Sequence, residues 1–520
     1  MPARSQDHVH RLIESMSPAE KRWFKRHLQR NGQEPGNNQE QLFDAIATME
    51  RYDEKTLLSR FSGAAFTRHF AITKRRLYES ILHSLESYHA ESSVDARLHK
   101  LLHQVEILHQ RALYADAQKI LASARKQAER HERAATLLAV REWERRLIEC
   151  RNYAGVGSDF VQAMTHADEL ARLTQEQVDR LWSIKSTLFL RIYHQGAARA
   201  EASAAEIQDL LSDPMLADGV KLHSAHSRFL HHHIHGAAAF ALGLNHECRK
   251  HLKANADLLD RERAAFKDEP NLILGVMSNL AYVTVQCGLY EEAFALLRRF
   301  RQLPGLWGMP ETEDLDLKLF ATTTSLELSM HLRLGDAVKA LEQIPVVERG
   351  LREHGQRLGP VRRALLQYEC AYALFVAGQP EKALRWTNEV LNGTRQDDQS
   401  DVSCFTRMLH LLLLHDAGKR DLLAYAHRNT ERFMKAHGRQ RRFEPRLLRL
   451  IGHLMHARND QDARAALAAF REDAIALLDD PQERSVLDYM DPVAWAESKL
   501  SEMPLADCIR ERAKRMGSAA

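Results

Sequence analysis

A short pattern recurs along this chain and constrains its fold more than any other feature. In the stretch 279–304 (NLAYVTVQCGLYEEAFALLRRFRQLP), Gly288 separates two runs with helical apolar periodicity, and Ala293 follows five residues later. Glycine readily adopts the positive φ that ends a helix. Glu291 and Glu292 then fall in the first turn of the next helix, where the helix dipole favours negative charge. The stretch therefore predicts a helical hairpin, and the small Ala293 allows its two helices to approach closely.

The same hairpin pattern recurs along most of the chain. Further copies place a small or apolar residue at the position of Ala293, namely at Ala117, Ala163, Ala202, Cys248, Ala340, Ala383, Leu423 and Ala463. From Cys248 onward the spacings between successive copies are 45, 47, 43, 40 and 40 residues. A regular period of this length is typical of stacked helix pairs. We therefore expect an all-α solenoid of about nine helix-turn-helix repeats.

These hairpins resemble tetratricopeptide repeats. The residues that fall on that motif's apolar, small and proline positions are Leu280, Ala281, Gly288, Tyr290, Ala293 and Pro304. The aromatic residue usual near the start of the first helix is missing, since Val276 and Met277 stand in that region. The spacings also exceed that motif's period of about 34 residues, so the helices should be longer. The resemblance covers roughly residues 95–480 and implies a right-handed superhelix whose first helices line a concave groove.

The chain outside the repeats divides into two further parts. We expect residues 1–92 to form an N-terminal helical module, 93–480 the tetratricopeptide-like solenoid, and 481–520 C-terminal capping helices. Ser17 and Glu20 have the spacing of a capping box at the start of a helix. The opening S-P-x-E-K-R-W-F, from Ser17 to Phe24, also resembles the start of uncharacterised bacterial proteins that carry such an array.

Composition and motifs argue against several classes of function. The formal net charge is +3, so no global field attracts the chain to nucleic acid or to a membrane surface. The six cysteines are scattered singly, which favours a reducing compartment. We see no signal peptide or membrane span, and we expect a cytoplasmic protein. Phosphate-binding glycine loops and nucleophile motifs are absent from the sequence, so we expect no enzyme activity and no cofactor.

The expected function is therefore a non-catalytic scaffold or adaptor that binds a peptide or protein partner in the solenoid groove. Candidate partner-binding residues on the inner helices are Asn279, Arg333, Gln367, Tyr368 and His410. A basic run from Arg428 to Arg449, with the aromatic residues Tyr425, Phe433 and Phe443 interleaved, adds Arg439 and Arg442. Such a run can bind an acidic protein, contact nucleic acid or form a solvated face.

The alternative function is a DNA-binding transcriptional regulator, with a helix-turn-helix-like N-terminal module and the array as its sensor. Between Lys55 and Arg76 the sequence has six basic residues and no acidic one. Lys74, Arg75 and Arg76 are the candidate contacts to nucleic acid. A solvated basic face and an acidic protein partner are the competing interpretations of these charges.

Histidines cluster near the middle of the chain, at His223, His226, His231, His232, His233 and His235. Imidazoles one helical turn apart, such as His231 and His235, can bind zinc or nickel. The sequence shows no set of cysteines or carboxylates nearby that would complete four ligands. We therefore expect no metal, and a general abundance of histidine explains the cluster.

Overall fold

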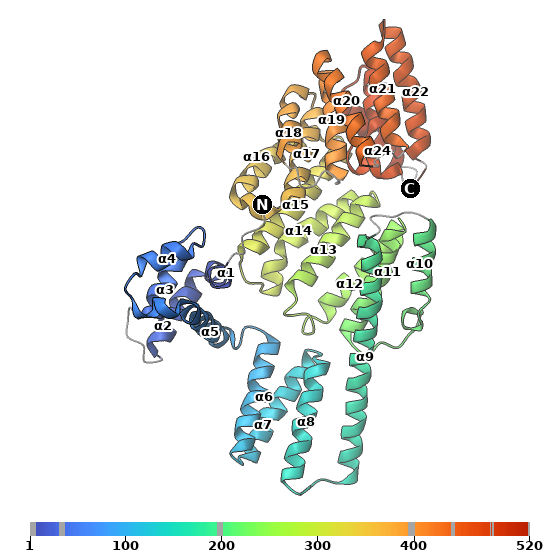
Figure 1. Cartoon of the computed structure of the whole chain (residues 1–520). Coiled ribbons are helices and arrows are strands. Elements are labelled where there is room, and N and C mark those ends of the chain that lie inside the picture. Colours follow the sequence, from blue (N-terminus) through green and yellow to red (C-terminus); the bar gives the residue numbers. More distant parts are fainter. Residues whose placement is uncertain are drawn as a thin grey trace. The chain divides into compact units, whose positions relative to one another are not determined.

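The structure, a computed structural model, describes residues 7–30, 37–194, 201–393, 401–437, 442–478, 480 and 483–517. Helix accounts for 83% of the chain, and the described residues contain no strand, which confirms the all-α class (Figure 1). None of the described helices combines the length and the apolar character that crossing a membrane requires. The chain divides into two compact units, Met1–Gln175 and Glu176–Ala520.

The first unit begins with a small helical module in which helix α5 packs against α1, α2 and α3. Its buried side chains include Val9, Phe24, Leu42 and Leu77. The predicted capping box is confirmed, because Ser17 Oγ accepts from the Glu20 N–H and the Glu20 carboxylate accepts from the Ser17 N–H. The elements are α1 (His8–Ser15), α2 (Pro18–Arg30), α3 (Asn38–Ala47), α4 (Glu54–Arg60), η1 (Ala65–His69) and α5 (Phe70–His89).

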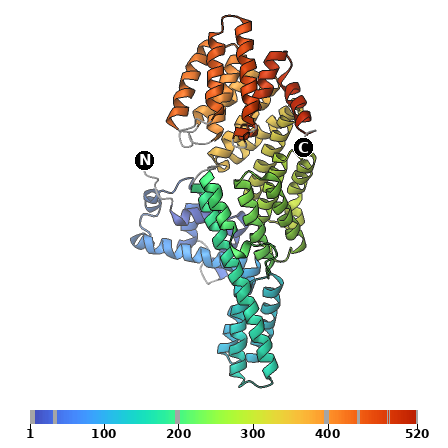
Figure 2. The same ribbon diagram turned by 90° about the vertical axis from the view of Figure 1, so that its right-hand side faces the viewer.

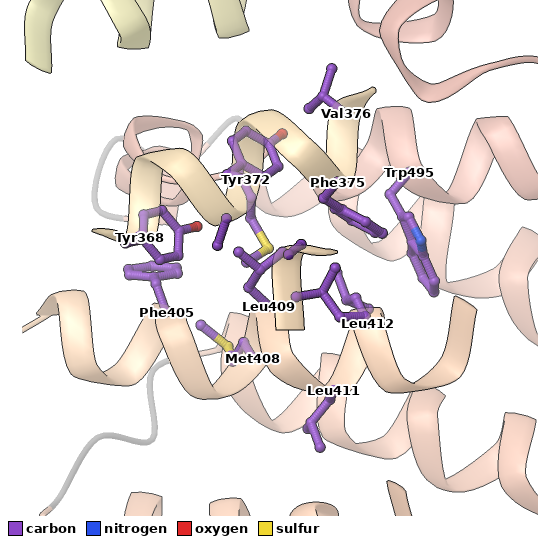
Figure 3. Close-up of a cluster of buried hydrophobic side chains, with 14 of the residues drawn as sticks. Tyr368, Tyr372, Phe375, Val376, Phe405, Met408, Leu409, Leu411, Leu412 and Trp495 are labelled. Atoms are coloured by element: carbon purple, nitrogen blue, oxygen red, sulfur yellow. The ribbon is translucent and has the colours of Figure 1, made fainter. Parts of the chain in front are cut away.

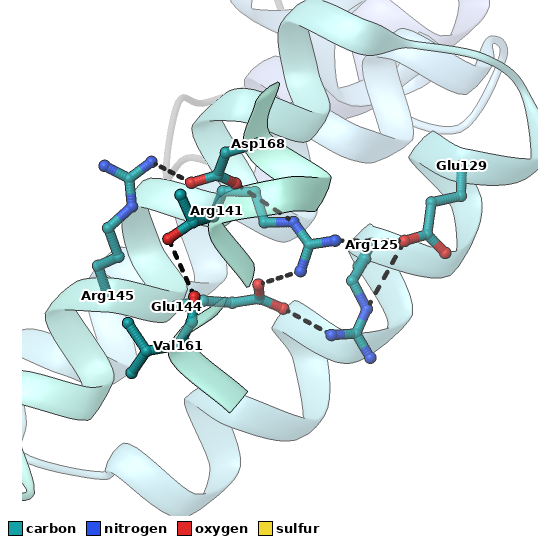
Figure 4. A network of polar contacts seen from close by, with 8 residues as sticks. Arg125, Glu129, Arg141, Glu144, Arg145, Val161 and Asp168 are labelled. Atoms are coloured by element: carbon teal, nitrogen blue, oxygen red, sulfur yellow. Dashed lines mark hydrogen bonds and ion pairs between the residues drawn. The ribbon is translucent and has the colours of Figure 1, made fainter. Parts of the chain in front are cut away.

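The rest of the first unit is a layer of antiparallel helices (Figure 2). These are α6 (Val94–Gln110), α7 (Tyr114–Arg130), α8 (Ala134–Cys150) and the first half of α9 (Ser158–His194). An ion-pair network joins α7, α8 and α9: Glu144 accepts from Arg125 at 3.0 Å and from Arg141 at 2.8 Å. On the other side of Arg141, Asp168 of α9 lies 3.7 Å from that guanidinium and 2.9 Å from Arg145 (Figure 4).

Helix α9 corrects one prediction from the repeat pattern. The sequence places one hairpin around Ala163 and starts another at residue 176, but the structure has a single helix of 37 residues from Ser158 to His194. The reason is that this stretch contains neither glycine nor proline. Without a helix-breaking residue, the second helix of one pair continues into the first helix of the next. The turn that the sequence predicts near Gly196 lies outside the described residues.

The second unit is a succession of helical hairpins, in which each helix from α11 to α24 packs against its neighbours along the chain. The first helices of the hairpins also pack against one another, from α13 to α15, α17, α19 and α21. We call these five the inner helices. The elements are α10 (Glu201–Leu211), η2 (Pro214–Leu216), α11 (Ala225–Ala241), α12 (Asn245–Arg261), α13 (Pro270–Gln286), α14 (Tyr290–Trp307), α15 (Glu313–Arg333), α16 (Ala337–His354), η3 (Gly355–Leu358), α17 (Pro360–Val376), α18 (Pro380–Gly393), α19 (Asp401–Asp416), α20 (Arg420–Ala436), α21 (Phe443–His456), α22 (Asp460–Leu478), η4 (Glu483–Asp488), α23 (Pro492–Ser501) and α24 (Leu505–Gly517).

The predicted glycine turns are confirmed. Gly243, Gly288, Gly335, Gly378 and Gly418 all have positive φ, between 66° and 76°. After Gly288, the Leu289 N–H donates to the Thr284 carbonyl at 3.1 Å, which closes the helix end. The copy at Ala117 keeps the same geometry without glycine: Ala112 has φ 58°, and the Leu113 N–H donates to the Leu108 carbonyl. The packing of the hairpin therefore sets the turn geometry. Glycine adopts the positive φ of this turn without the steric strain that other residues have there.

Two of these glycines form a matched pair for mutagenesis. A Cβ atom on Gly288 would meet no heavy atom within 4 Å, whereas a Cβ atom on Gly335 would overlap the carbonyl oxygen of Ala506 in α24. We expect Gly288→Ala to lower the free energy of unfolding by about 1 kcal/mol, through left-handed strain alone. Gly335→Ala should cost a further 1–3 kcal/mol or so, because α24 must also move. Urea unfolding of the two variants checks this, and equal losses would contradict the contact with α24.

Candidate partner-binding surface

The C-terminal parts of two inner helices are buried on all sides. In α17, every residue from Tyr368 to Val376 is buried, and in α19 the apolar run from Leu411 to Leu414 is fully enclosed. A helix that lines an open groove keeps one polar, solvated face. These stretches have no such face, so another part of the chain must cover them on the inner side.

The C-terminal segment, residues 483–517, provides that cover. The Tyr368 hydroxyl donates to the Tyr489 carbonyl at 3.2 Å, and the Asp491 N–H donates to the Tyr372 hydroxyl at 3.0 Å. The ring of Tyr489 stacks on Phe405 of α19, with centroids 4.1 Å apart. Trp495 of α23 is 1% exposed and belongs to the same core as α17 and α19 (Figure 3).

Charged contacts fix the segment at several points. Arg333 of α15 pairs with Asp488 at 2.8 Å, and Asp416 of α19 pairs with Lys499 at 2.7 Å. In α24, the Arg510 guanidinium donates to the carbonyl oxygen of Gly335, at the end of α15. Because the segment buries apolar side chains as well as making these pairs, it is an integral layer of the array.

This layer corrects the prediction for Tyr368. The sequence places its side chain in an open groove, but it is 1% exposed and lies under the C-terminal segment. Gln367 and His410 are partly buried and already have partners within the array: the Gln367 amide donates to Glu389, and His410 Nδ1 lies 2.9 Å from Thr387 Oγ1. These residues support the packing of α17, α18 and α19.

An uncovered surface remains on α11 and α13. Phe240 of α11 is 47% exposed and Tyr282 of α13 is 36% exposed, and their rings meet edge to face with centroids 6.2 Å apart. Asn279 is exposed one turn before Tyr282, and Gln286 follows one turn after it. The guanidinium of Arg333 lies 3.5 Å from the Gln286 carboxamide oxygen. We call these five residues the α13 surface.

The α13 surface brings together two of the predicted partner-binding residues, Asn279 and Arg333. Sequence reasoning missed Phe240 and Tyr282, although both stand near the C-terminal end of a first helix, a few residues before its glycine turn. Their position in the repeat was therefore visible in the sequence. The sequence does not reveal that these two rings are exposed. The corresponding C-terminal parts of α17 and α19 follow the same pattern and are buried.

Two of the three aromatic rings of the basic run near the C-terminus are buried. These are Phe433 and Phe443, and the Arg407 guanidinium lies over the Phe433 ring, whereas Tyr425 is 62% exposed. Arg442 is exposed. Its backbone N–H donates to the Glu483 carboxylate, and its guanidinium lies 3.3 Å from the Asp480 carboxylate. Arg439 lies outside the described residues. The interleaved pattern expected for contact with nucleic acid is therefore not formed by Phe433 and Phe443.

The structure also corrects the role expected for Lys74. Its ammonium is held inside the N-terminal module, 2.7 Å from Asp7, 2.9 Å from Glu54 and 3.0 Å from the Tyr52 hydroxyl, and its side chain is 14% exposed. A cation neutralised in this way is not available to a phosphate. The two following residues are exposed: Arg75 pairs with Glu79, and Arg76 points to solvent.

The histidines of α11 form contacts with α12 and with one another. The rings of His231 and His235 are 4.6 Å apart, His235 stacks on His251 of α12, and His232 Nδ1 lies 3.2 Å from His251 Nδ1. Burial, and then the neighbouring imidazoles His235 and His232, lower the pKa of His231 to about 4. No group of three or more ligands with metal-binding geometry occurs in the described part of the chain.

Glu369 is a buried carboxyl group on α17. One of its oxygens lies 2.7 Å from Ser325 Oγ, and burial raises the pKa of this group to about 8. At neutral pH the folded protein therefore holds Glu369 in its uncharged form, as expected for a carboxyl group in an apolar core.

Comparison of the chain with protein-family models, curated proteins and solved structures gave no match. The assignment of a function therefore depends on the geometry of the chain itself.

The buried proton on Glu369 predicts a pH dependence of stability. Between about pH 4.5 and pH 8 the unfolded chain releases this proton and the folded chain keeps it, so stability falls as the pH rises, by up to about 1.4 kcal/mol per pH unit. Glu369→Gln removes this contribution and should stabilise the protein more at pH 8 than at pH 5. Urea unfolding at both pH values measures the difference, with the exposed Glu381→Gln as the matched control. Parallel pH profiles for Glu369→Gln and the unchanged protein would rule out the buried proton.

Proposed function

We propose that this protein is a non-catalytic protein–protein interaction scaffold, whose α13 surface binds a peptide or protein partner. The proposal includes the finer architecture expected from the repeat pattern: a right-handed superhelix of about nine tetratricopeptide-like helix pairs, similar to those of uncharacterised bacterial proteins. The singly placed cysteines favour a cytoplasmic location. The observation that carries the proposal is the exposed aromatic pair Phe240 and Tyr282 on the inner side of the hairpins.

Two exposed aromatic rings in contact are what a partner-binding surface needs at its centre. Aromatic residues, tyrosine above all, dominate the binding energy of protein interfaces, because they bury a large area with little loss of side-chain entropy. Phe240 and Tyr282 come from successive first helices, so a partner can cover both rings by lying across α11 and α13.

The polar groups around the rings match the backbone of an extended peptide. The carboxamide of Asn279 has two donors and one acceptor, so it can bond both the C=O and the N–H of a bound chain. Gln286 offers a second carboxamide on the same face of α13. Arg333 is already committed to Asp488 at the edge of the C-terminal segment. We therefore assign it the role of fixing this edge of the surface.

The C-terminal segment restricts where a partner can bind. It packs on α17 and α19, so a partner cannot lie along those two helices. The exposed rings stand on α11 and α13, and a partner confined to these two helices is a short peptide segment rather than a long helix.

The test is to select peptides on the full-length protein from a random library and to measure their affinity by fluorescence anisotropy. We expect Phe240→Ala/Tyr282→Ala to weaken binding by about 10- to 30-fold, because each ring is a central anchor. The matched control is Tyr425→Ala on α20, a tyrosine that is 62% exposed on the second helix of its hairpin. Its loss should leave the affinity unchanged. A selection without specific peptides, or equal affinities for the double variant and the unchanged protein, would refute this surface.

A further inference from the structure

Helix α2 of the N-terminal module carries three arginines in a line. Arg22, Arg26 and Arg30 are spaced by four residues and are all exposed. With a rise of 1.5 Å per residue, neighbouring members of this line stand roughly 6 Å apart along the helix. In the described part of the chain none of the three forms an ion pair, whereas Lys25, on another face of α2, pairs with Asp44 at 2.8 Å. We call Arg22, Arg26 and Arg30 the arginine stripe.

An indole ring holds two members of the stripe in place. The guanidinium groups of Arg26 and Arg30 lie 5.7 Å and 5.6 Å from the centroid of the Trp23 ring. Trp23 is itself fixed by Tyr88 of α5, which meets it edge to face at 5.5 Å. Stacking on an aromatic face keeps a guanidinium ordered and leaves its N–H donors free for a ligand.

The acidic groups near the stripe have other partners. Glu20, one turn before the stripe, accepts from His89 at 2.6 Å and from the Ser17 N–H. Asp44 is paired with Lys25. On α5, the exposed Glu86 lies 3.5 Å from His83 Nδ1. None of these three carboxylates forms an ion pair with the stripe in the described part of the chain.

A histidine of α2 stands beside the stripe. The ring of His27 lies 5.3 Å from the ring of His83 on α5. Burial lowers the pKa of His27, and the charges of His83 and Arg30 lower it further.

We propose that the arginine stripe binds the phosphodiester backbone of a nucleic-acid duplex. The planar fork of arginine matches phosphate oxygens in a bidentate manner. Three guanidinium groups that follow one another along α2 can contact several phosphates of one strand. Such contacts depend on charge and not on base sequence.

The surface suits a polyanion better than a peptide. The described residues of α2 expose no large hydrophobic side chain, and the nearest exposed aromatic ring, Tyr88 of α5, is 40% exposed and lies against Trp23. Protein partners need an apolar anchor at the centre of an interface, whereas here the centre is charged. This site is separate from the α13 surface and also from Lys74, whose charge is neutralised inside the module. The nucleic-acid contact proposed here therefore lies on α2 and does not involve Lys74.

The test uses the full-length protein and a fluorescein-labelled DNA duplex of about 25 base pairs, with anisotropy measured between 50 and 300 mM KCl. Three phosphate contacts contribute a slope of about −2.7 to the plot of log K against log salt. We expect R22Q/R26Q/R30Q to flatten the slope by about this amount and to weaken binding at least 10-fold at 50 mM KCl. The matched control is R68Q/R75Q/R76Q, which removes three exposed arginines elsewhere in the same module.

Each result decides the proposal. A loss confined to R22Q/R26Q/R30Q, with a thermal unfolding midpoint equal to that of the unchanged protein, supports the stripe. Equal losses in both triple variants would mean that only net charge matters, and unchanged binding in R22Q/R26Q/R30Q would mean that the stripe is not used. Tighter binding of a single strand of the same length, or of poly-L-glutamate, would overturn the assignment to a duplex.

Discussion

The packing of the C-terminal segment against α17 and α19 is the interaction on which the second unit depends. These two helices are too apolar to face water, and a hairpin covers only one side of each. Residues 483–517 bury the other side, with Tyr489 on Phe405 and Trp495 in the common core. The last residues of the chain therefore stabilise a helix more than 100 positions earlier. The hydrogen bond from the Tyr368 hydroxyl of α17 to the Tyr489 carbonyl is one such contact.

This packing also decides where the array can interact. Where the inner side is covered, polar residues such as Gln367 serve the internal structure. The first helices α11 and α13 instead carry exposed aromatic rings, at Phe240 and Tyr282. The contrast between covered and uncovered inner helices is the physical basis for placing a partner on the α13 surface.

In the N-terminal module, the pairing of charges separates structural cations from available ones. Lys74 stands in a basic stretch of the sequence, but Asp7 and Glu54 neutralise it. Arg26 and Arg30 stand in another basic stretch, and they face solvent beside an indole ring. Two stretches that look alike in the sequence therefore present different charges at the surface.

The sequence by itself determined the helical class, the hairpin period and the turns, because these depend on local features: apolar periodicity and the positive φ of residues such as Gly288. It also placed Asn279 and Arg333 on inner helices. The burial of Tyr368, the neutralisation of Lys74 and the exposure of Tyr282 were decided only by the tertiary structure. Each of these depends on a contact between segments distant in sequence, such as α17 with residues 483–517, and a repeat pattern contains no information about which segment covers which.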